Sequence, residues 1–193
     1  MNDYPDEIPS RAHRAYTVAG DAGFTMSCEP RTGMLLATLA ASKPAGRILE
    51  IGTGAGAGSA WLLEGMDRSA TLTTVEVDAD RAALAHQVLH DDARVVIVNQ
   101  DARTWLTKYV GDPFDLVFCD WRTGKFDERW LVLRHLALGG IYIGDDLLPQ
   151  PTWPDDHQPR VDQFVAEVVK EPALVVTLMS WASGLVVASR RIL

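Results

Sequence analysis

Three aspartates follow two apolar runs of the sequence, at the point where each run ends. Asp120 closes FDLVFCD, and Asp145 and Asp146 follow GGIYIG in the next such run. If the two runs form neighbouring strands, these carboxylates converge, and unpaired acids that close raise one another's pKa values. A divalent cation would relieve that repulsion, and all-oxygen ligation suits Mg²⁺, Mn²⁺ or Ca²⁺ better than zinc. The alternative without a metal has Asp120 hydrogen-bonding a ligand while Asp145 or Asp146 caps a turn.

A second group of residues with chemical potential is the glycine-rich stretch ILEIGTGAGAGSAW, residues 48–61. An apolar run ends there in a turn with glycine at every second position, Gly52, Gly54, Gly56 and Gly58, before helix-like residues resume. Glycine lets backbone N–H groups approach a ligand closely, and the start of a helix attracts anionic or polar groups. GTGAGA also fits the dinucleotide pattern G-x-G-x-x-G/A, so a nicotinamide or flavin enzyme is one interpretation.

Two glutamates indicate what the turn holds. Glu76 ends the run TVE, where a carboxylate can accept hydrogen bonds from both hydroxyls of a ribose. Glu50 lies two residues before the first glycine, where a dinucleotide site normally has an apolar residue. A carboxylate there suits a ligand that bears an ammonium and a sulfonium. Glu76 therefore favours a cofactor that contains a nucleoside, and Glu50 favours S-adenosylmethionine over a dinucleotide.

Strands and helices that alternate along the chain must position these residues. The expected strands, most of them separated by segments with helical spacing, are residues 47–51, 71–77, 93–99, 114–120, 139–145, 173–179 and 184–189. Near-continuous apolar strands separated by helices imply a parallel sheet covered on both faces, so the predicted fold is α/β and doubly wound. Residues 180–183 are too few for a crossover helix, so the last two strands must form a hairpin, with an antiparallel strand at or near one sheet edge.

With this pattern the chain resembles the class I S-adenosylmethionine-dependent methyltransferases, and among them the small cation-dependent O-methyltransferases typified by catechol O-methyltransferase. The resemblance covers roughly residues 24–191 and rests on FTMSCEPRTGMLL, ILEIGTGAG, TVEVD and VNQDA, in that order. It implies a Rossmann-like sheet of seven strands, mostly parallel with the last strand antiparallel. GKF, DDLLPQPTW and SWASG look more like a group of bacterial O-methyltransferase-like proteins of unknown substrate.

The resemblance also implies a set of binding residues. Met26 and Cys28 match positions that flank the cofactor in the family, although a core methionine explains Met26 equally well. VNQDA matches the stretch that borders the adenine. The implied cofactor-binding residues are Met26, Cys28, Glu50, Gly52, Thr53, Gly54, Gly56, Ser59, Glu76, Val77, Asp101, Ala102, Asp120 and Trp121. The family's metal ligands, two Asp and an Asn, match Asp120, Asp145 and Asp146, with Asp146 in place of the Asn.

The implied reaction is methyl transfer to a hydroxyl oxygen, with Asp120 and Lys125 as the predicted catalytic residues. A bound cation would hold that oxygen and lower the pKa of the hydroxyl, and the sulfonium of the donor is already a good leaving group. Catechol-type enzymes carry a lysine three residues after the first metal ligand, where this chain has Thr123. Lys125 is therefore either a base in a shifted loop or a solvated lysine at a helix start. His157 is a second candidate base, or an exposed loop histidine.

Other departures from the family pattern concern the donor's carboxylate and the acceptor. Ala57 and Gly58 replace a tyrosine and a serine, so contacts to the methionine carboxylate must come from backbone N–H groups or Ser59. TLMSWASG, residues 177–184, has no acid to bind a second catechol hydroxyl, which argues against catechol itself. The tryptophans that either wall an aromatic or apolar acceptor pocket or simply pack are Trp121, Trp153 and Trp181.

Length and composition limit the other possibilities. The 193 residues suit a single domain, residues 1–193, with an irregular N-terminal arm at 1–23 and a substrate-side surface loop at 148–159. A net charge of −8 without clustered Lys and Arg argues against nucleic acid as a partner. Two lone cysteines, no secretory signal and no long apolar run predict a cytoplasmic protein that does not enter membranes. The short arm leaves the acceptor site either open or completed by the second subunit of a homodimer.

Three classes of function therefore compete. The first is an S-adenosylmethionine-dependent O-methyltransferase acting on a small-molecule hydroxyl, phenolic or similar, assisted by Mg²⁺ or another divalent cation. A nicotinamide-dependent oxidoreductase is disfavoured by Glu50 and by the terminal hairpin. A cofactor-binding protein without turnover is kept open by the missing consensus lysine. Amino-methylation of nucleic acid is disfavoured because CDWR, residues 119–122, replaces the Asn/Asp-Pro-Pro-aromatic stretch of such enzymes.

Overall fold

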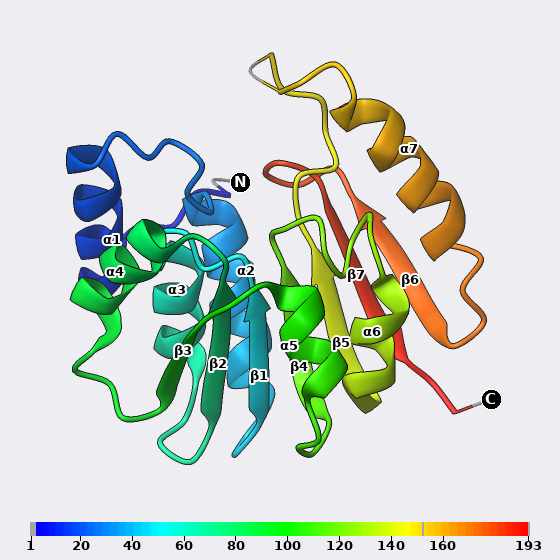
Figure 1. Cartoon of the computed structure of the whole chain (residues 1–193), viewed down its shortest axis with the longest axis horizontal. Helices are drawn as coiled ribbons and strands as arrows, with labels where there is room; N and C mark the ends of the chain where they lie inside the picture. The colour runs from blue at the N-terminus through cyan, green and yellow to red at the C-terminus, as the bar shows by residue number, and fades with distance from the viewer. Residues whose placement is uncertain (1–2, 152, 193) are drawn as a thin grey trace.

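The computed structural model describes residues 3–151 and 153–192; Met1 and Asn2 of the predicted arm, Thr152 of the predicted loop and Leu193 lie outside the described residues. One sheet has the strand order β3-β2-β1-β4-β5-β7-β6 (Figure 1). Its strands are β1 Arg47–Ile51, β2 Thr71–Glu76, β3 Val95–Asn99, β4 Phe114–Cys119, β5 Leu136–Gly144, β6 Leu174–Met179 and β7 Leu185–Arg190. Strands β1 to β5 are parallel, and β7 is antiparallel to both β5 and β6. The predicted seven-stranded, mostly parallel sheet with a terminal hairpin is confirmed.

Helices cover both faces of this sheet. They are α1 Ser10–Asp21, α2 Pro30–Ala41, α3 Ala57–Gly65, α4 Ala79–Leu89, α5 Ala102–Lys108, α6 Arg129–His135 and α7 His157–Val168. In Figure 1, α5 and α6 lie in front of the strands and α2 lies behind them. Alternate residues of a strand point to opposite faces, so Ile48 packs in the cluster with α2, α3 and α4, while Leu49 packs with α5, α6 and α7. Among the described helices, none has both the length and the apolar character needed to span a membrane.

Two segments expected to be irregular contain helix. The predicted N-terminal arm forms α1, because Ala12, Ala15 and Ala19 recur at helical spacing and are buried against α3 and α4. The predicted loop at 148–159 ends earlier than expected, since α7 already begins at His157. Proline is tolerated in the first turn of a helix, which is where Pro159 lies. The prolines of that segment therefore marked both a loop and a helix start.

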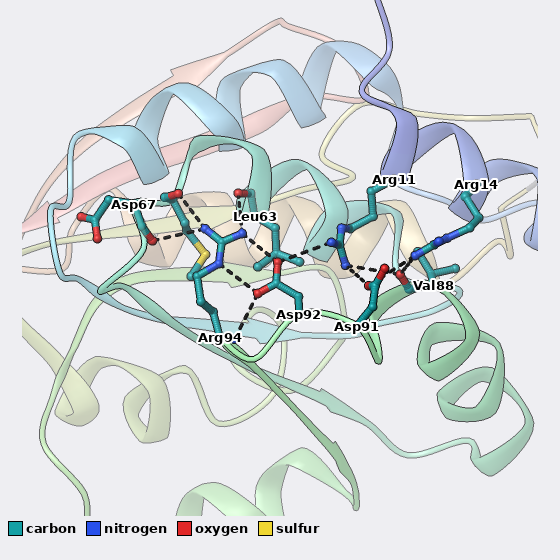
Figure 2. Close-up of polar contacts among 9 residues, drawn as sticks. Arg11, Arg14, Leu63, Asp67, Val88, Asp91, Asp92 and Arg94 are labelled. Atoms are coloured by element: carbon teal, nitrogen blue, oxygen red, sulfur yellow. Dashed lines mark hydrogen bonds and ion pairs between the residues drawn. The ribbon is translucent and has the colours of Figure 1, made fainter.

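A network of arginines and aspartates attaches α1 and the turn before β3 to the rest of the domain (Figure 2). Arg11 on α1 contacts Asp91 at 2.6 Å, and Arg14 donates to the carbonyl of Val88 at the end of α4. Arg94 donates to the carbonyl oxygen of Met66 at 2.7 Å and to Asp92 at 2.8 Å. Because guanidinium groups here hydrogen-bond carbonyls that a helix end leaves without partners, they stabilise the carboxyl ends of α3 and α4.

The strand register brings four separate stretches to one edge of the sheet. Ile51 pairs with both Val75 and Cys119, and Cys119 pairs with Gly144. The chain therefore leaves β1, β2, β4 and β5 at the same level, at the upper edge of the sheet in Figure 1. Doubly wound sheets bind ligands at this carboxyl edge.

Candidate functional site

Three carboxylates meet where β4 and β5 end. Asp120 follows β4, Asp145 and Asp146 follow β5, and one carboxylate oxygen of each lies within 4.8 Å of the others. The backbone holds the aspartates there, because Asp120 N–H donates to Ile51 O at 2.9 Å and Asp145 N–H donates to Cys119 O at 3.3 Å. The predicted convergence of these three acids is confirmed, and it follows from the pairing of β4 with β5.

Burial makes the ionised forms of these carboxyl groups unfavourable. Burial raises the pKa of Asp120 well above its ordinary value, and the neighbouring carboxylates of Asp146 and Asp145 raise it further. Burial, and then the charge of Asp146, also raises the pKa of Asp145. The ammonium of Lys125 opposes both shifts. The arrangement holds negative charge that its own surroundings do not fully compensate.

Lys125 lies inside this group rather than in solvent. Its side chain is 3% exposed, and its Nζ donates to the carbonyl oxygen of Asp145 at 2.7 Å. The residue belongs to a turn in which the N–H groups of Lys125, Phe126 and Asp127 donate to Arg122 O, and α6 begins only at Arg129. The interpretation of Lys125 as a solvated lysine at a helix start is therefore wrong.

The donor set of the acidic group fits a hard divalent cation. Asp145 Oδ1 accepts from Ser183 and from the N–H of Asp146, so within the described residues Oδ2 is the oxygen left for another partner. The three carboxyl groups outnumber the one ammonium of Lys125, so ionising all of them leaves an excess of negative charge. A divalent cation would compensate that excess, and all the side-chain donors are oxygens, as Mg²⁺, Mn²⁺ or Ca²⁺ prefers.

The glycine turn and Glu76 form a second part of the same edge. Glu76 is 5% exposed, and its carboxylate accepts from Gly54 N–H at 2.9 Å and from Asp78 N–H at 3.0 Å. Gly52 has φ +95°, and a Cβ there would lie 2.9 Å from the carbonyl oxygen of Asp120. Glycine is needed at this position because the turn after β1 passes directly over the end of β4.

Glu50 is buried beside this turn. Its side chain accepts from Thr74 at 2.6 Å and from Ser59, and the residue is 1% exposed. Burial raises the pKa of Glu50 to about 7, and the two hydroxyl hydrogen bonds counteract that rise. A Cβ on Gly58 would lie 2.3 Å from Glu50 Oε1. The glycine that replaces the family's serine therefore makes room for the glutamate.

One cleft of about 230 Å³ connects the two parts. Its walls on the side of β4 and α7 are rich in aromatic groups, including Trp121, Phe126 and Trp153. His157 lies between two of them, with ring centroids 3.7 Å from Trp153 and 5.4 Å from Phe126. The same cleft therefore reaches the glycine turn, the acidic group and this aromatic wall.

Most of the predicted residues line this cleft. Those that do are Met26, Cys28, Glu50, Gly52, Thr53, Gly54, Glu76, Asp120, Trp121, Lys125, Asp146, Trp153 and His157. Met26 is 62% exposed, so its interpretation as a core methionine is wrong. His157 is half-buried and is the first residue of α7, so it is not an exposed loop histidine.

Other predicted residues lie next to the cleft without lining it. Asp145 is 2% exposed and lies behind Asp146, and Ser59 is fully buried with its hydroxyl donated to Glu50. Val77 is 51% exposed, and Asp101 accepts from Thr104 N–H as the N-cap of α5. The predicted residues outside the lining are Gly56, Ser59, Val77, Asp101, Ala102, Asp145 and Trp181.

Several residues of the cleft were not selected from the sequence. The main ones are Phe24, Arg81, Arg122, Phe126 and Arg160. Arg122 and Phe126 follow β4 within seven residues, so their position after a strand end was an available signal. Arg160 had no such signal, because only the packing of α7 brings it to the cleft.

Comparison with known proteins identifies the family of this chain. A family profile described as a methyltransferase domain matches residues 49–147, about half of the chain. A curated protein of Mycolicibacterium vanbaalenii, named provisionally as an O-methyltransferase, is 35% identical over 173 residues, which cover 83% of this chain and 76% of the relative. The chain belongs to the class I S-adenosylmethionine-dependent O-methyltransferases.

Other members of the O-methyltransferase family extend the comparison. A provisionally named O-methyltransferase of Mycobacterium sp. strain KMS is 35% identical over 121 residues, and the chain spans only about half of its length, 54%. The O-methyltransferase from Bacillus cereus in complex with SAH has a TM-score of 0.84 at 21% identity, covering 98% of this chain and 94% of that one. TomG from Streptomyces achromogenes, in complex with SAM, has a TM-score of 0.82 at 22% identity, covering 96% and 92%. These structures share the O-methyltransferase fold with this chain.

Proposed function

We propose that the protein transfers a methyl group from S-adenosylmethionine to a hydroxyl oxygen of a small-molecule acceptor, with a divalent cation held by Asp120, Asp145 and Asp146. The observation that carries this proposal is the single cleft that joins Glu76 and the glycine turn to the acidic group. In an O-methyltransferase the donor and the acceptor must meet in one water-poor space, which such a cleft provides. Family membership argues against a nicotinamide-dependent oxidoreductase.

Glu76 and Glu50 divide the binding of the donor between them. The Glu76 carboxylate is already oriented by Gly54 and Asp78 N–H groups, and its remaining lone pairs can accept the two ribose hydroxyls. Glu50 lies on the other side of the turn, where its carboxylate can hold the ammonium of the donor's methionine part. A cation beside Glu50 favours its ionised form, so binding of the donor would lower the pKa that burial raises.

The acidic group would bind the acceptor through the cation. When bound, such an ion supplies Lewis acidity that lowers the pKa of an acceptor hydroxyl and fixes its oxygen. Asp120 and Asp146 line the cleft, and the almost fully buried Asp145 would complete the ligand set. Trp121 and Trp153 supply apolar surface that suits a phenolic or similar ring.

Lys125, in its neutral amine form, is the proposed proton acceptor for the hydroxyl. It lines the cleft, and its hydrogen bond to Asp145 O fixes the position of Nζ beside the acidic group. His157 is the second candidate, since its Nε2 lies 3.3 Å from Asp146 O and its ring lines the same cleft. General bases contribute roughly a hundredfold or more to the rate, so the two candidates can be separated by substitution.

The proposal is tested in two steps. Calorimetry with S-adenosylhomocysteine and with NAD⁺ should give binding with the first only; absence of heat from S-adenosylhomocysteine would contradict the proposal. Methyl transfer to a panel of phenols, measured by product mass with and without EDTA, should then show turnover that Mg²⁺ or Mn²⁺ restores. Binding without turnover on the panel would favour the alternative of a cofactor-binding protein.

The same assay identifies the base. Lys125→Met keeps the length of the side chain and removes the amine, so it should lower kcat by about a hundredfold. His157→Asn is the comparison, because it keeps a hydrogen-bonding group at the same point of α7. A hundredfold loss in His157→Asn with little change in Lys125→Met would assign the proton transfer to the histidine instead.

A further inference from the structure

The mouth of the cleft carries positive charge that the proposed reaction does not use. Arg122, from the turn after β4, and Arg160, from the first half of α7, both line the cleft. Their side chains are 48% and 38% exposed, whereas Asp145 and Lys125 at the acidic group are almost fully buried. The cleft is therefore acidic at its buried end, whereas Arg81, Arg122 and Arg160 outnumber the exposed carboxylate of Asp156 in the rest of its lining, in a chain whose net charge is −8.

Neither arginine is held by a strong ion pair. Arg122 Nε lies 3.5 Å from Asp127 Oδ2, and Arg160 Nε lies 3.0 Å from Asp156 Oδ2. The two aspartate side chains are 45% and 64% exposed, and ion pairs between exposed side chains contribute little to stability. A guanidinium has five N–H donors, so both arginines can also bind an anion that enters the cleft.

Aromatic side chains lie in the same part of the cleft as the two arginines. Trp121 is adjacent to Arg122 in the chain, lines the cleft and is 39% exposed, so part of its ring is accessible to a ligand. Trp153 is fixed by its contact with His157, three residues before Arg160. A ligand that presents a flat ring to these tryptophans would bring a substituent of that ring towards the guanidinium groups.

We infer that the acceptor is an aromatic hydroxyl compound with an anionic substituent, a carboxylate or a phosphate, and that Arg122 and Arg160 bind this anion. The inference rests on the proposed function. It assigns the two ends of the acceptor to opposite ends of the cleft: the hydroxyl to the buried acidic group, and the anion to the arginines. An acceptor placed the other way round would bring its anion against Asp120 and Asp146, which is electrostatically unfavourable.

The test uses three ligands with the same dihydroxyphenyl ring. Caffeate carries a carboxylate, methyl caffeate is neutral, and caffeoyl-coenzyme A carries its negative charge on phosphates. Calorimetry in the presence of S-adenosylhomocysteine and Mg²⁺ gives the Kd of each. The protein should bind caffeate or caffeoyl-coenzyme A at least about tenfold more tightly than methyl caffeate, the change that one charge-assisted hydrogen bond produces. Tight binding of caffeate indicates a carboxylate site, and tight binding of the thioester alone indicates a phosphate site.

Substitution then locates the anion. Arg122→Gln and Arg160→Gln remove the charge but keep polar side chains, and the double variant should reduce the ratio of neutral to anionic Kd to near one. Arg103→Gln is the matched control, because Arg103 on α5 is 66% exposed and does not line the cleft; it should keep the ratio.

Three outcomes are decisive. A ratio near one in the parent protein, or no binding of either anionic ligand, overturns the inference and leaves the proposed function standing. A high ratio that survives in the double arginine variant also overturns it. Failure to bind S-adenosylhomocysteine overturns the proposed function, and this inference with it.

Discussion

Replacing Gly58 by alanine tests the packing between α3 and Glu50. A Cβ at Gly58 would lie 2.3 Å from Glu50 Oε1 and 3.1 Å from Phe118 Cε1, both well inside normal contact. Phe118 is fully buried and cannot yield. The Glu50 carboxylate would have to move by about 1 Å to restore ordinary contact. That movement disturbs the hydrogen bonds that it accepts from Ser59 and Thr74.

The expected loss combines opposing effects. Alanine is favoured over glycine in a helix by about 1 kcal/mol. Overpacking in a well-packed interior costs about 1–3 kcal/mol. A buried hydroxyl of Ser59 or Thr74 left without its acceptor costs about 1–3 kcal/mol more. Gly58→Ala should therefore lower the free energy of unfolding by about 1–5 kcal/mol.

The matched control is Gly20→Ala, which makes the same substitution in another helix. Gly20 lies in α1, and a Cβ there would meet nothing within 4 Å. This variant should raise the free energy of unfolding by about 0.5–1 kcal/mol. Thermal and urea unfolding measure both variants, and Gly58→Ala should melt at least about 3 °C below the parent protein. If the two variants are equally stable, the close packing of Glu50 against α3 is refuted. Calorimetry on Gly58→Ala should also show weaker binding of S-adenosylhomocysteine, because Gly58 and Glu50 both line the cleft.

Three other changes have expected outcomes. The hydrogen bond from Arg94 is the main cause that lowers the pKa of Asp92 to about 2, so this carboxylate contributes stability above its unfolded pKa of about 3.9 and loses it as pH falls through about 2. Asp92→Asn should lower the free energy of unfolding by about 1 kcal/mol at pH 7, after allowance for the partial exposure of Asp92. Urea titrations measure this loss, which should become smaller as the pH falls towards 2. A difference between the variant and the parent protein that stays constant with pH would contradict this. Tyr16 donates to Cys28 O at 2.9 Å, so Tyr16→Phe should lower stability by about 1–3 kcal/mol and weaken S-adenosylhomocysteine binding in calorimetry. Unchanged binding would mean that the position of Cys28 in the cleft does not depend on the hydrogen bond from Tyr16. Asp145→Asn should raise the Mg²⁺ concentration needed for half-maximal methyl transfer about tenfold or more, and an unchanged Mg²⁺ dependence would argue against a metal role for Asp145.

Much of the architecture was predictable from local pattern. Strands such as Phe114–Cys119 are short apolar runs, and the four residues between the last two strands leave no length for a crossover helix. The glycine turn after β1 and the acid at the end of β2 follow from residue type and position, because these positions must lie at the carboxyl edge of a parallel sheet. The helix α1 was missed, although Ala12, Ala15 and Ala19 carried its spacing.

Some residues of the site could be predicted from the sequence, and others could not. Asp120, Asp145 and Asp146 could be placed together because each directly follows a strand, and chain continuity carries a strand-end residue to the sheet edge. The environment of Lys125 could not be foreseen, because its burial depends on a turn that folds back beneath β5. Arg160 reaches the cleft only through the packing of α7, and Ser59 is withdrawn from it by its bond to Glu50. Short-range pattern determines which residues end a strand, whereas long-range packing determines which side chains remain accessible to a ligand.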